Sequence, residues 1–322
     1  MYQDNSFFHK IGFDCIILTI FLLASCAKFV DVGAPTTKIG VKEAYQSDAT
    51  ATSAIVGLYN NSYIGYLTIY FTGLLGCSAD DIKYATASTS YLEFTNNAIT
   101  SGNPNNANYL WADTYSEILQ SNLAITNLNA SNALTPAVKN QLLGEAKTWR
   151  AFMYFYLVNM YGNVPLELTT DNDINGHMSR TSSDSVWAQI ITDLKDAVNL
   201  LSPDYPTAQR ARINKYTAMA LLAKAYLYTK DWKDAAQTAG DIINSGIYSL
   251  SADLNTSFNN TSNEIIWQIA TTTGISVFGS NFLAPKGSLP AYIMYDTLYH
   301  SFEANDLRNQ DWTMSDTIVS TP

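Results

Sequence analysis

Histidine, the side chain that most often carries out acid–base catalysis, occurs only three times in this sequence. The histidines are His9, His177 and His300, and neither a nucleophile-elbow string nor a metal-spaced His/Glu helix accompanies them. Asp80 and Asp81 form an acidic pair near aromatic residues, but adjacent side chains usually point apart, which favours a loop cap or a polar ligand contact. The pattern therefore predicts no catalytic residue, no cofactor and a protein that is not an enzyme. Hydrolysis by carboxylates without a signature motif stays the alternative.

Residues 171–177, DNDINGH, imitate the first half of a calcium-binding loop. In an EF-hand the twelfth position of the loop supplies a bidentate glutamate, and counting from Asp171 that position is Ser182. Because the decisive ligand is missing, we interpret the segment as a surface loop and predict no metal site. Calcium near Asp171 is the alternative.

Gly, Ser, Thr and Asn are abundant between residues 72 and 108, which we expect to form a long loop, and aromatic residues lie among them. Flat apolar rings surrounded by amide and hydroxyl groups suit a sugar-binding surface, and loops carry binding residues disproportionately. Asp81, Tyr84 and Tyr91 are therefore the candidate ligand-binding residues. In the competing interpretation these aromatic side chains only hold the loop on its helices. The stretch 271–290 has a similar character.

The composition of the chain excludes some classes of partner. Charged residues make up only 14% of the 322 residues, against about a quarter in typical proteins, and the formal net charge is −10. An acidic chain without clustered Lys and Arg is not suited to binding nucleic acid. A surface that relies on Asn, Ser, Thr and Tyr for its polarity instead suits neutral ligands that form hydrogen bonds.

Residues 1–25 are expected to be a signal peptide and not part of the fold. A lysine precedes an apolar run at 15–24 that is too short to span a bilayer and is followed by Ser-Cys. The string Leu-Ala-Ser-Cys resembles a lipobox, which implies that Cys26 becomes the first mature residue, is acylated and anchors the protein to the lipid bilayer. Residues 26–44 are then a lipidated tether. Of the remaining cysteines only Cys77 belongs to the mature chain, as a small buried apolar residue.

The elements that must position the candidate residues are helical. Apolar residues recur every three or four positions, and a Thr135-Pro136 start and a Gly162 end predict one long helix over 136–161. A helix at about 107–129 carries Trp, Tyr, Ile, Asn and Ile on one stripe. These two helices are the expected centre of the core.

The long helix contains an acidic-Ala pair, then Trp-Arg-Ala-Phe at 149–152, an aromatic run, and Tyr-Gly-Asn-Val-Pro-Leu at 161–166. This order resembles the hallmark helix of the SusD/RagB family of Bacteroidetes outer-membrane lipoproteins. The resemblance implies a non-enzymatic protein that is lipid-anchored in the outer membrane and exposed at the cell surface. It also implies that the protein binds oligosaccharides or peptides and delivers them to a SusC-like TonB-dependent transporter.

A repeat pattern completes the expected fold. Residues 211–250 fit the tetratricopeptide template, with small residues at both helix crossings and a turn at Asp231-Trp232. The helices over 136–161 and 183–201 are interpreted as a second such pair, and alternating residues at 263–270 predict a strand. The fold class is therefore mainly α, a tetratricopeptide-like helical-repeat scaffold with long loops and a few short strands.

Residues 45–322 are predicted to form this SusD-like helical-repeat domain. Chains of the family that it resembles continue well past the Leu, Phe, Asp, Arg and Trp pattern at 298–312, so the domain is expected to lack its C-terminal part. The alternative function is that of a repeat-type lipoprotein scaffold for envelope assembly without ligand capture.

Overall fold

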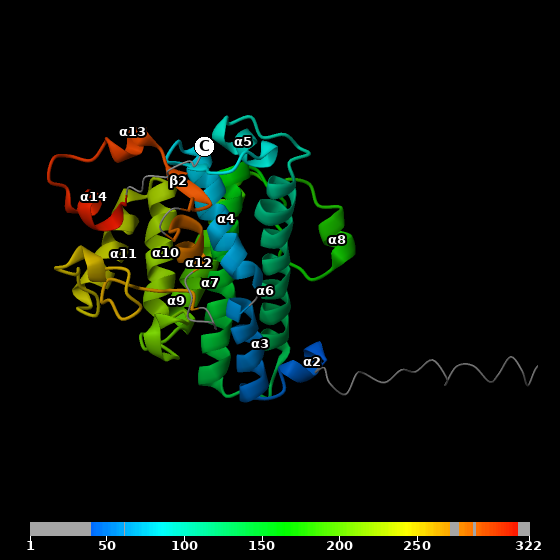
Figure 1. The fold of residues 1–322 in the computed structure, drawn as a ribbon. Coiled ribbons are helices and arrows are strands. Elements are labelled where there is room, and N and C mark those ends of the chain that lie inside the picture. The colour runs from blue at the N-terminus through cyan, green and yellow to red at the C-terminus, as the bar shows by residue number, and fades with distance from the viewer. Residues whose placement is uncertain (1–39, 61, 271–276, 286–287, 315–322) are drawn as a thin grey trace, which may run out of the picture. The chain divides into compact units, whose positions relative to one another are not determined.

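The computed structural model describes residues 40–60, 62–270, 277–285 and 288–314, and the chain divides into two units between Ala44 and Tyr45. The first unit contains helix α2 (Val41–Ala44). The second unit contains the other elements drawn in Figure 1, which are α3 (Asp48–Asn60), α4 (Ser62–Ser78), β1 (Ile82–Tyr84), α5 (Thr89–Thr95), the π-helix η1 (Asn105–Ala112), α6 (Asp113–Ala130), α7 (Pro136–Tyr161), α8 (Asn172–Gly176), α9 (Ser183–Leu200), η2 (Ala208–Arg210), α10 (Lys215–Tyr228), α11 (Trp232–Asn244), η3 (Leu254–Thr256), α12 (Val277–Phe282), β2 (Tyr292–Met294), α13 (Asp296–Tyr299) and α14 (Leu307–Trp312). The predicted signal at 1–25 and the lipidation site Cys26 lie outside the described residues.

Helix α7 has the bounds that the sequence predicts, 136–161, and its side chains Trp149 and Tyr154 are fully buried. Gly162 ends it with φ +66°, a backbone conformation that favours glycine. The sequence also predicts that Thr135 caps α7; Thr135 does occupy the N-cap position, but its side chain accepts no hydrogen bond from the first turn. Its hydroxyl and its N–H donate to the two carboxylate oxygens of Asp48, both at 2.9 Å, so Thr135 ties the start of α7 to the start of α3 instead.

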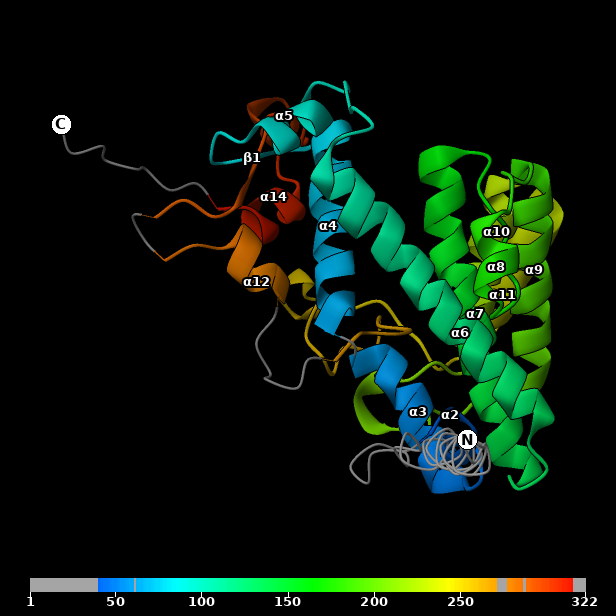
Figure 2. The same cartoon turned by 90° about the vertical axis from the view of Figure 1, so that its right-hand side faces the viewer.

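Helices α6, α7, α9, α10 and α11 lie side by side, each packed on the next (Figures 1 and 2). The pairing of α7 with α9, and of α10 with α11, confirms the helical-repeat scaffold. Gly144 allows α7 to approach the end of α9, because a Cβ atom there would collide with the Leu201 side chain. At the turn between α10 and α11 the Asp231 side chain accepts from the Asp234 N–H, which starts α11.

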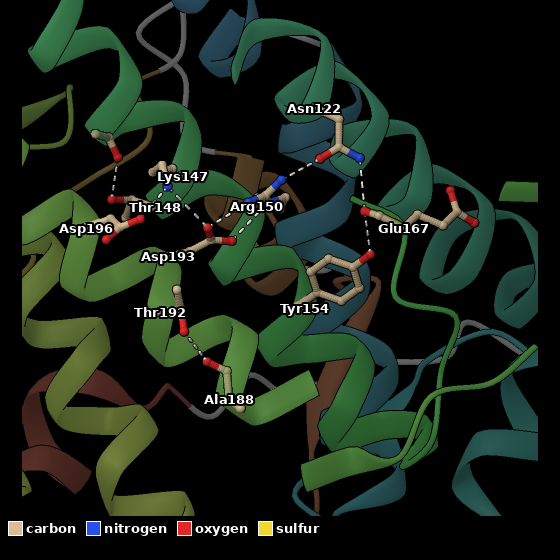
Figure 3. A network of polar contacts seen from close by, with 11 residues as sticks. Asn122, Lys147, Thr148, Arg150, Tyr154, Glu167, Ala188, Thr192, Asp193 and Asp196 are labelled. Carbon is tan, nitrogen blue, oxygen red and sulfur yellow. Dashed lines mark hydrogen bonds and ion pairs between the residues drawn. The ribbon is translucent and has the colours of Figure 1, made fainter. Parts of the chain in front are cut away.

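A buried polar network joins the three central helices (Figure 3). Arg150 on α7 donates from Nε and Nη2 to both carboxylate oxygens of Asp193 on α9, at 2.8 and 2.7 Å. Its Nη1 donates to Asn122 Oδ1 on α6 at 2.8 Å. Asn122, which is buried, also donates to the Glu167 and Thr169 carbonyls. One guanidinium therefore fixes α6, α7 and α9 relative to one another.

A second buried network connects α3 with α7 and with the segment that precedes α10. The Glu145 carboxylate is 1% exposed and forms an ion pair with Arg212. It also accepts from the Tyr59 hydroxyl at 2.6 Å and from Gln141 Nε2 at 3.0 Å. Tyr59 in turn accepts from the Ile213 N–H at 3.2 Å. The buried charge thus has three polar neighbours, as a charge removed from water requires.

Two other expectations from the sequence are wrong. Residues 263–270 do not pair as a strand; Arg210 and Gln268 hold the segment instead, Arg210 through the Asn263 and Ile265 carbonyls and Gln268 through the carbonyl of Asn260. The predicted loop at 72–108 begins as the second half of α4 and includes β1 and α5. Leu74 and Phe94, within this stretch, are therefore core residues.

Asp171, considered above as the first position of a calcium loop, caps α8. Its carboxylate accepts from the backbone N–H groups of Asp173, at 2.9 Å, and Ile174, at 3.2 Å. Among the described residues, no group of three or more His, Cys, Asp or Glu side chains is placed to hold a metal ion. No helix within the described ranges is both long and apolar enough to cross a membrane.

Candidate ligand-binding site

The two strands form a small platform against α4. Strand β1 pairs with β2 in antiparallel register, with Ile82 opposite Met294 and Tyr84 opposite Tyr292. Both strands and helices α5 and α12 contact one another or α4, and Figure 2 shows them gathered at that helix. Segments that are about 200 residues apart in the sequence are therefore brought together at the residues predicted to bind ligand.

Two of the predicted site residues stack directly on each other. The rings of Tyr84 and Tyr91 lie 3.8 Å apart between centroids and are inclined by 10°. The Tyr292 ring meets both edge to face, at 5.4 and 6.2 Å, and Phe282 stacks on Tyr292 at 5.2 Å. Phe278 extends this row from α12. We call these five residues the Tyr84 cluster.

The cluster has a buried base and an accessible outer part. Tyr292 is 3% exposed, Tyr84 and Tyr91 are half-buried, and Phe278 is exposed. Burial raises the pKa of the Tyr292 hydroxyl well above its ordinary value, and the neighbouring Tyr91 raises it further. Burial also raises the pKa of Tyr91. Both hydroxyl groups therefore stay protonated at neutral pH and can donate and accept hydrogen bonds.

Glycine in α4 makes the base of the cluster possible. A Cβ atom on Gly73 would collide with the phenol ring and hydroxyl of Tyr292, so the ring packs directly against the helix backbone. Cys77, one turn further along α4, is fully buried, as the sequence predicts, and burial raises the pKa of its thiol. A buried thiol with a raised pKa behaves as a small apolar side chain.

Asp81, the third predicted site residue, lies at the start of β1 and is exposed. Its backbone carbonyl accepts from the Tyr295 N–H at 3.0 Å and its own N–H donates to the Gly76 carbonyl at 3.1 Å. Within the part of the chain that the structure describes, its carboxylate has no hydrogen bond or ion pair. The carboxylate is thus free to accept a hydrogen bond from a ligand.

The loop after α5 is held by one carboxylate. Glu93 Oε2 accepts from the Thr100 N–H, from the Thr100 hydroxyl and from Asn103 Nδ2, each at 2.9 Å. These hydrogen bonds lower the pKa of Glu93, the Thr100 N–H contributing most. The loop therefore keeps α5, which carries Tyr91, in place.

Sequence reasoning identified Tyr84 and Tyr91 but did not connect them with Tyr292. The 271–290 stretch, which contains Phe278 and Phe282, was expected to be a binding loop, whereas Tyr292 lies just beyond it. The sequence signal for Tyr292 is weak. Tyr292 begins a short apolar run, Tyr-Ile-Met, and no local pattern indicates the strand with which this run pairs.

Solved structures with this fold include SusD-like proteins. A laminarin-binding SusD-like protein matches with a TM-score of 0.71 at 22% identity, covering 83% of this chain and 66% of that one. A SusD-like carbohydrate-binding protein from Bacteroides fragilis matches with a TM-score of 0.67 at 21% identity, covering 81% of this chain and 54% of that one. At such identities the likeness shows the shared fold.

Proteins that are similar in sequence over a large part of the chain are also SusD-like. SusD-like protein P25 of Formosa agariphila is 27% identical over 292 residues, which is 85% of this chain and 54% of the relative. SusD-like protein P2 of the same organism is 30% identical over 247 residues, 73% of this chain and 46% of the relative. The chain thus spans about half the length of these relatives. The SusD-like family described as "Starch-binding associating with outer membrane" matches residues 28–227, more than half of the chain, and the chain belongs to this family.

Proposed function

We propose that this protein binds oligosaccharides at the Tyr84 cluster and passes them to a SusC-like TonB-dependent transporter in the outer membrane. The observation that carries the proposal is the stacked Tyr84–Tyr91 pair, which is half-buried and so leaves ring surface accessible, and the exposed Asp81 precedes the strand that carries Tyr84. An accessible ring supplies an apolar platform for a sugar ring, and the carboxylate and phenol groups take its hydroxyls. Capture takes place without bond cleavage, and peptides are the alternative ligand.

The family supports this assignment. It is described as starch-binding, and one structural neighbour is a laminarin-binding protein. Acylation of Cys26 would anchor the protein to the outer membrane and keep it at the cell surface, where polysaccharides arrive. Delivery to the transporter follows in this proposal from co-localisation in the same membrane.

A glycan panel tests the binding. Calorimetry of the purified protein should detect at least one neutral oligosaccharide, and Tyr84→Ala should weaken that interaction about tenfold, equivalent to roughly 1.4 kcal/mol. Tyr84→Phe keeps the platform and should retain most of the affinity. Tyr228→Ala is the matched control, because Tyr228 is an exposed tyrosine on α10 outside the cluster. Unchanged affinity in Tyr84→Ala would exclude the cluster as the site.

A second experiment separates this proposal from an envelope scaffold that captures no ligand. On intact cells, externally added protease should degrade a surface-exposed receptor, whereas a periplasmic scaffold would be protected. Replacing Cys26 by serine removes the acylated sulfur and should release the protein from the membrane fraction. Protection from the protease combined with no glycan binding would favour the scaffold.

A further inference from the structure

A polar cavity lies in the segment that follows α11. Its volume is about 340 Å³, and apart from Leu250 its lining residues between 249 and 263 are all serine, threonine or asparagine. Small-molecule sites typically have volumes of about 300–1,000 Å³. No residue of this cavity belongs to the Tyr84 cluster. It is therefore a separate candidate site of sufficient size.

Charged residues behind the cavity fix its walls. The Arg210 guanidinium donates to the Asn263 carbonyl at 3.1 Å and to the Ile265 carbonyl, and it lies over the Tyr248 ring, 4.9 Å from its centroid. The Glu264 carboxylate accepts from the Ser251 N–H and from the Ser257 hydroxyl. Because Arg210 and Glu264 form hydrogen bonds to different parts of the segment, they hold the residues that line the cavity in place.

Several polar side chains of the lining are available to a ligand. Among the described residues, the side chains of Ser249, Asn259 and Thr261 have no hydrogen-bond partner. They offer hydroxyl and amide groups that can both donate and accept. No lining residue is charged. This set of groups matches a neutral ligand that carries many hydroxyls, and it lacks the cations needed to select a phosphate or a carboxylate.

One exposed aromatic ring of the same segment, Phe258, pairs with a ring of α14. Phe258, between the lining residues Thr256 and Asn259, is 77% exposed and meets the Trp312 ring at 5.0 Å between centroids. Trp312 is held by its own hydrogen bond, from Nε1 to the Leu254 carbonyl at 3.0 Å. An exposed ring pair held in place provides an apolar face for the carbon-bound hydrogens of a sugar ring.

We propose that this cavity and the Phe258–Trp312 pair form a second saccharide-binding site. Its ligand is a short segment of a neutral glycan, whose hydroxyls bond to Asn259 and Thr261 while a sugar ring lies against Phe258. The choice of a glycan as ligand rests on the proposed function, but the two sites share no residue. A chain with two sites holds a long polysaccharide more tightly than either site alone, because the second contact is intramolecular.

Hydrogen–deuterium exchange of the full chain tests the site. The probes are maltohexaose, laminarihexaose, xylohexaose and mannohexaose at millimolar concentration. At least one of them should slow exchange at 249–263, and the protection should persist in Tyr84→Ala. The double variant Asn259→Ala/Thr261→Val should abolish it. Because neither side chain has a partner among the described residues, this variant should fold normally, as the unchanged exchange of α7 will show.

Titration of two single variants adds a quantitative test. Phe258→Ala should raise the glycan concentration needed for half-maximal protection at 249–263 about tenfold, because the sugar ring loses a stacking face. Trp232→Ala, which removes an exposed aromatic ring at the start of α11, should leave it unchanged. Equal effects of these two substitutions would overturn the role of Phe258.

Three outcomes would overturn the site itself. These are no protection at 249–263 with any of the four probes, protection that survives the double variant, or equal protection by a neutral Gly-Ser peptide. Protection at 82–91 without protection at 249–263 would refute this site and leave the proposed function standing. Protection at 249–263 without protection at 82–91 would support this site and contradict the proposed function of the Tyr84 cluster.

Discussion

Replacing Asp193 by leucine tests whether the polar network at the centre of the scaffold is essential for stability. Asp193 is 1% exposed, and it is the partner of both the Nε and Nη2 groups of Arg150 (Figure 3). Lys147 Nζ lies 3.9 Å from the same carboxylate. Leucine branches at Cγ as aspartate does and is larger, so the substitution removes the charge without leaving a cavity. Arg150, which is itself buried, would keep only its hydrogen bond to Asn122.

The loss of stability on this substitution arises from the Arg150 guanidinium, which stays buried without its carboxylate partner. Removing one partner of a buried ion pair typically costs about 3–5 kcal/mol. Proteins unfold with a free energy of about 5–15 kcal/mol, so the loss is a large fraction of the total. Asp196→Asn is the matched control on the same helix. Asp196 is half-exposed and pairs with Lys147 at 2.6 Å, so its loss should cost about 0–1 kcal/mol.

Urea unfolding followed by circular dichroism measures both values. The double variant Arg150→Met/Asp193→Leu removes the stranded charge together with its partner, and should therefore be more stable than Asp193→Leu alone. It should still be less stable than the parent protein, because Asn122 Oδ1 loses its donor at about 1–3 kcal/mol. A double variant no more stable than the single one would refute the argument, since the cost would then not arise from the unpaired guanidinium.

Two further predictions concern the Tyr84 cluster and its supporting loop. Gly73→Ala should displace the Tyr292 ring and weaken glycan binding measured by calorimetry, whereas Gly57→Ala, with nothing within 4 Å of its added Cβ, should leave binding unchanged. Glu93 has a folded-state pKa below its ordinary value of 4.5. Its contribution to the stability of the loop after α5 is therefore present above about pH 4.5 and is lost as the pH falls through the lowered pKa. Amide exchange at Thr100, corrected for intrinsic rates, should accelerate in that acidic range, and Glu93→Gln should remove the pH dependence.

Most of the scaffold could be predicted because its signals are local. The bounds of α7 follow from a proline at its first position and a glycine after its end, both acting within a few residues. Alternation at 263–270 predicted a strand, yet a strand also needs a partner. Arg210, more than 50 residues earlier, supplies donors to the carbonyls of this segment, and that distant contact decides its conformation.

The candidate site was less predictable, because contacts between residues that are distant in the sequence determine it. Residue type and loop position were sufficient to select Tyr84 and Tyr91, because aromatic residues in a polar stretch are unusual. Their arrangement depends on the pairing of β1 with β2, strands of three residues each that are too short to produce a clear alternation. The close packing of Tyr292 on Gly73 is likewise a tertiary contact with no signal in either segment alone.

Tyr115 and Asn122 on α6 and Tyr154 on α7 share one structural role, which explains why these polar side chains occur in a helical core. The extended segment after α7 has no strand partner for most of its carbonyl groups, and buried carbonyls need donors. Tyr115 donates to the Pro165 carbonyl at 2.8 Å, and Tyr154 and Asn122 both donate to the Glu167 carbonyl at 3.0 Å. The tyrosines and the asparagine thus replace a missing strand. Because Asn122 also binds Arg150, the conformation of this segment is coupled to the ion pair between α7 and α9.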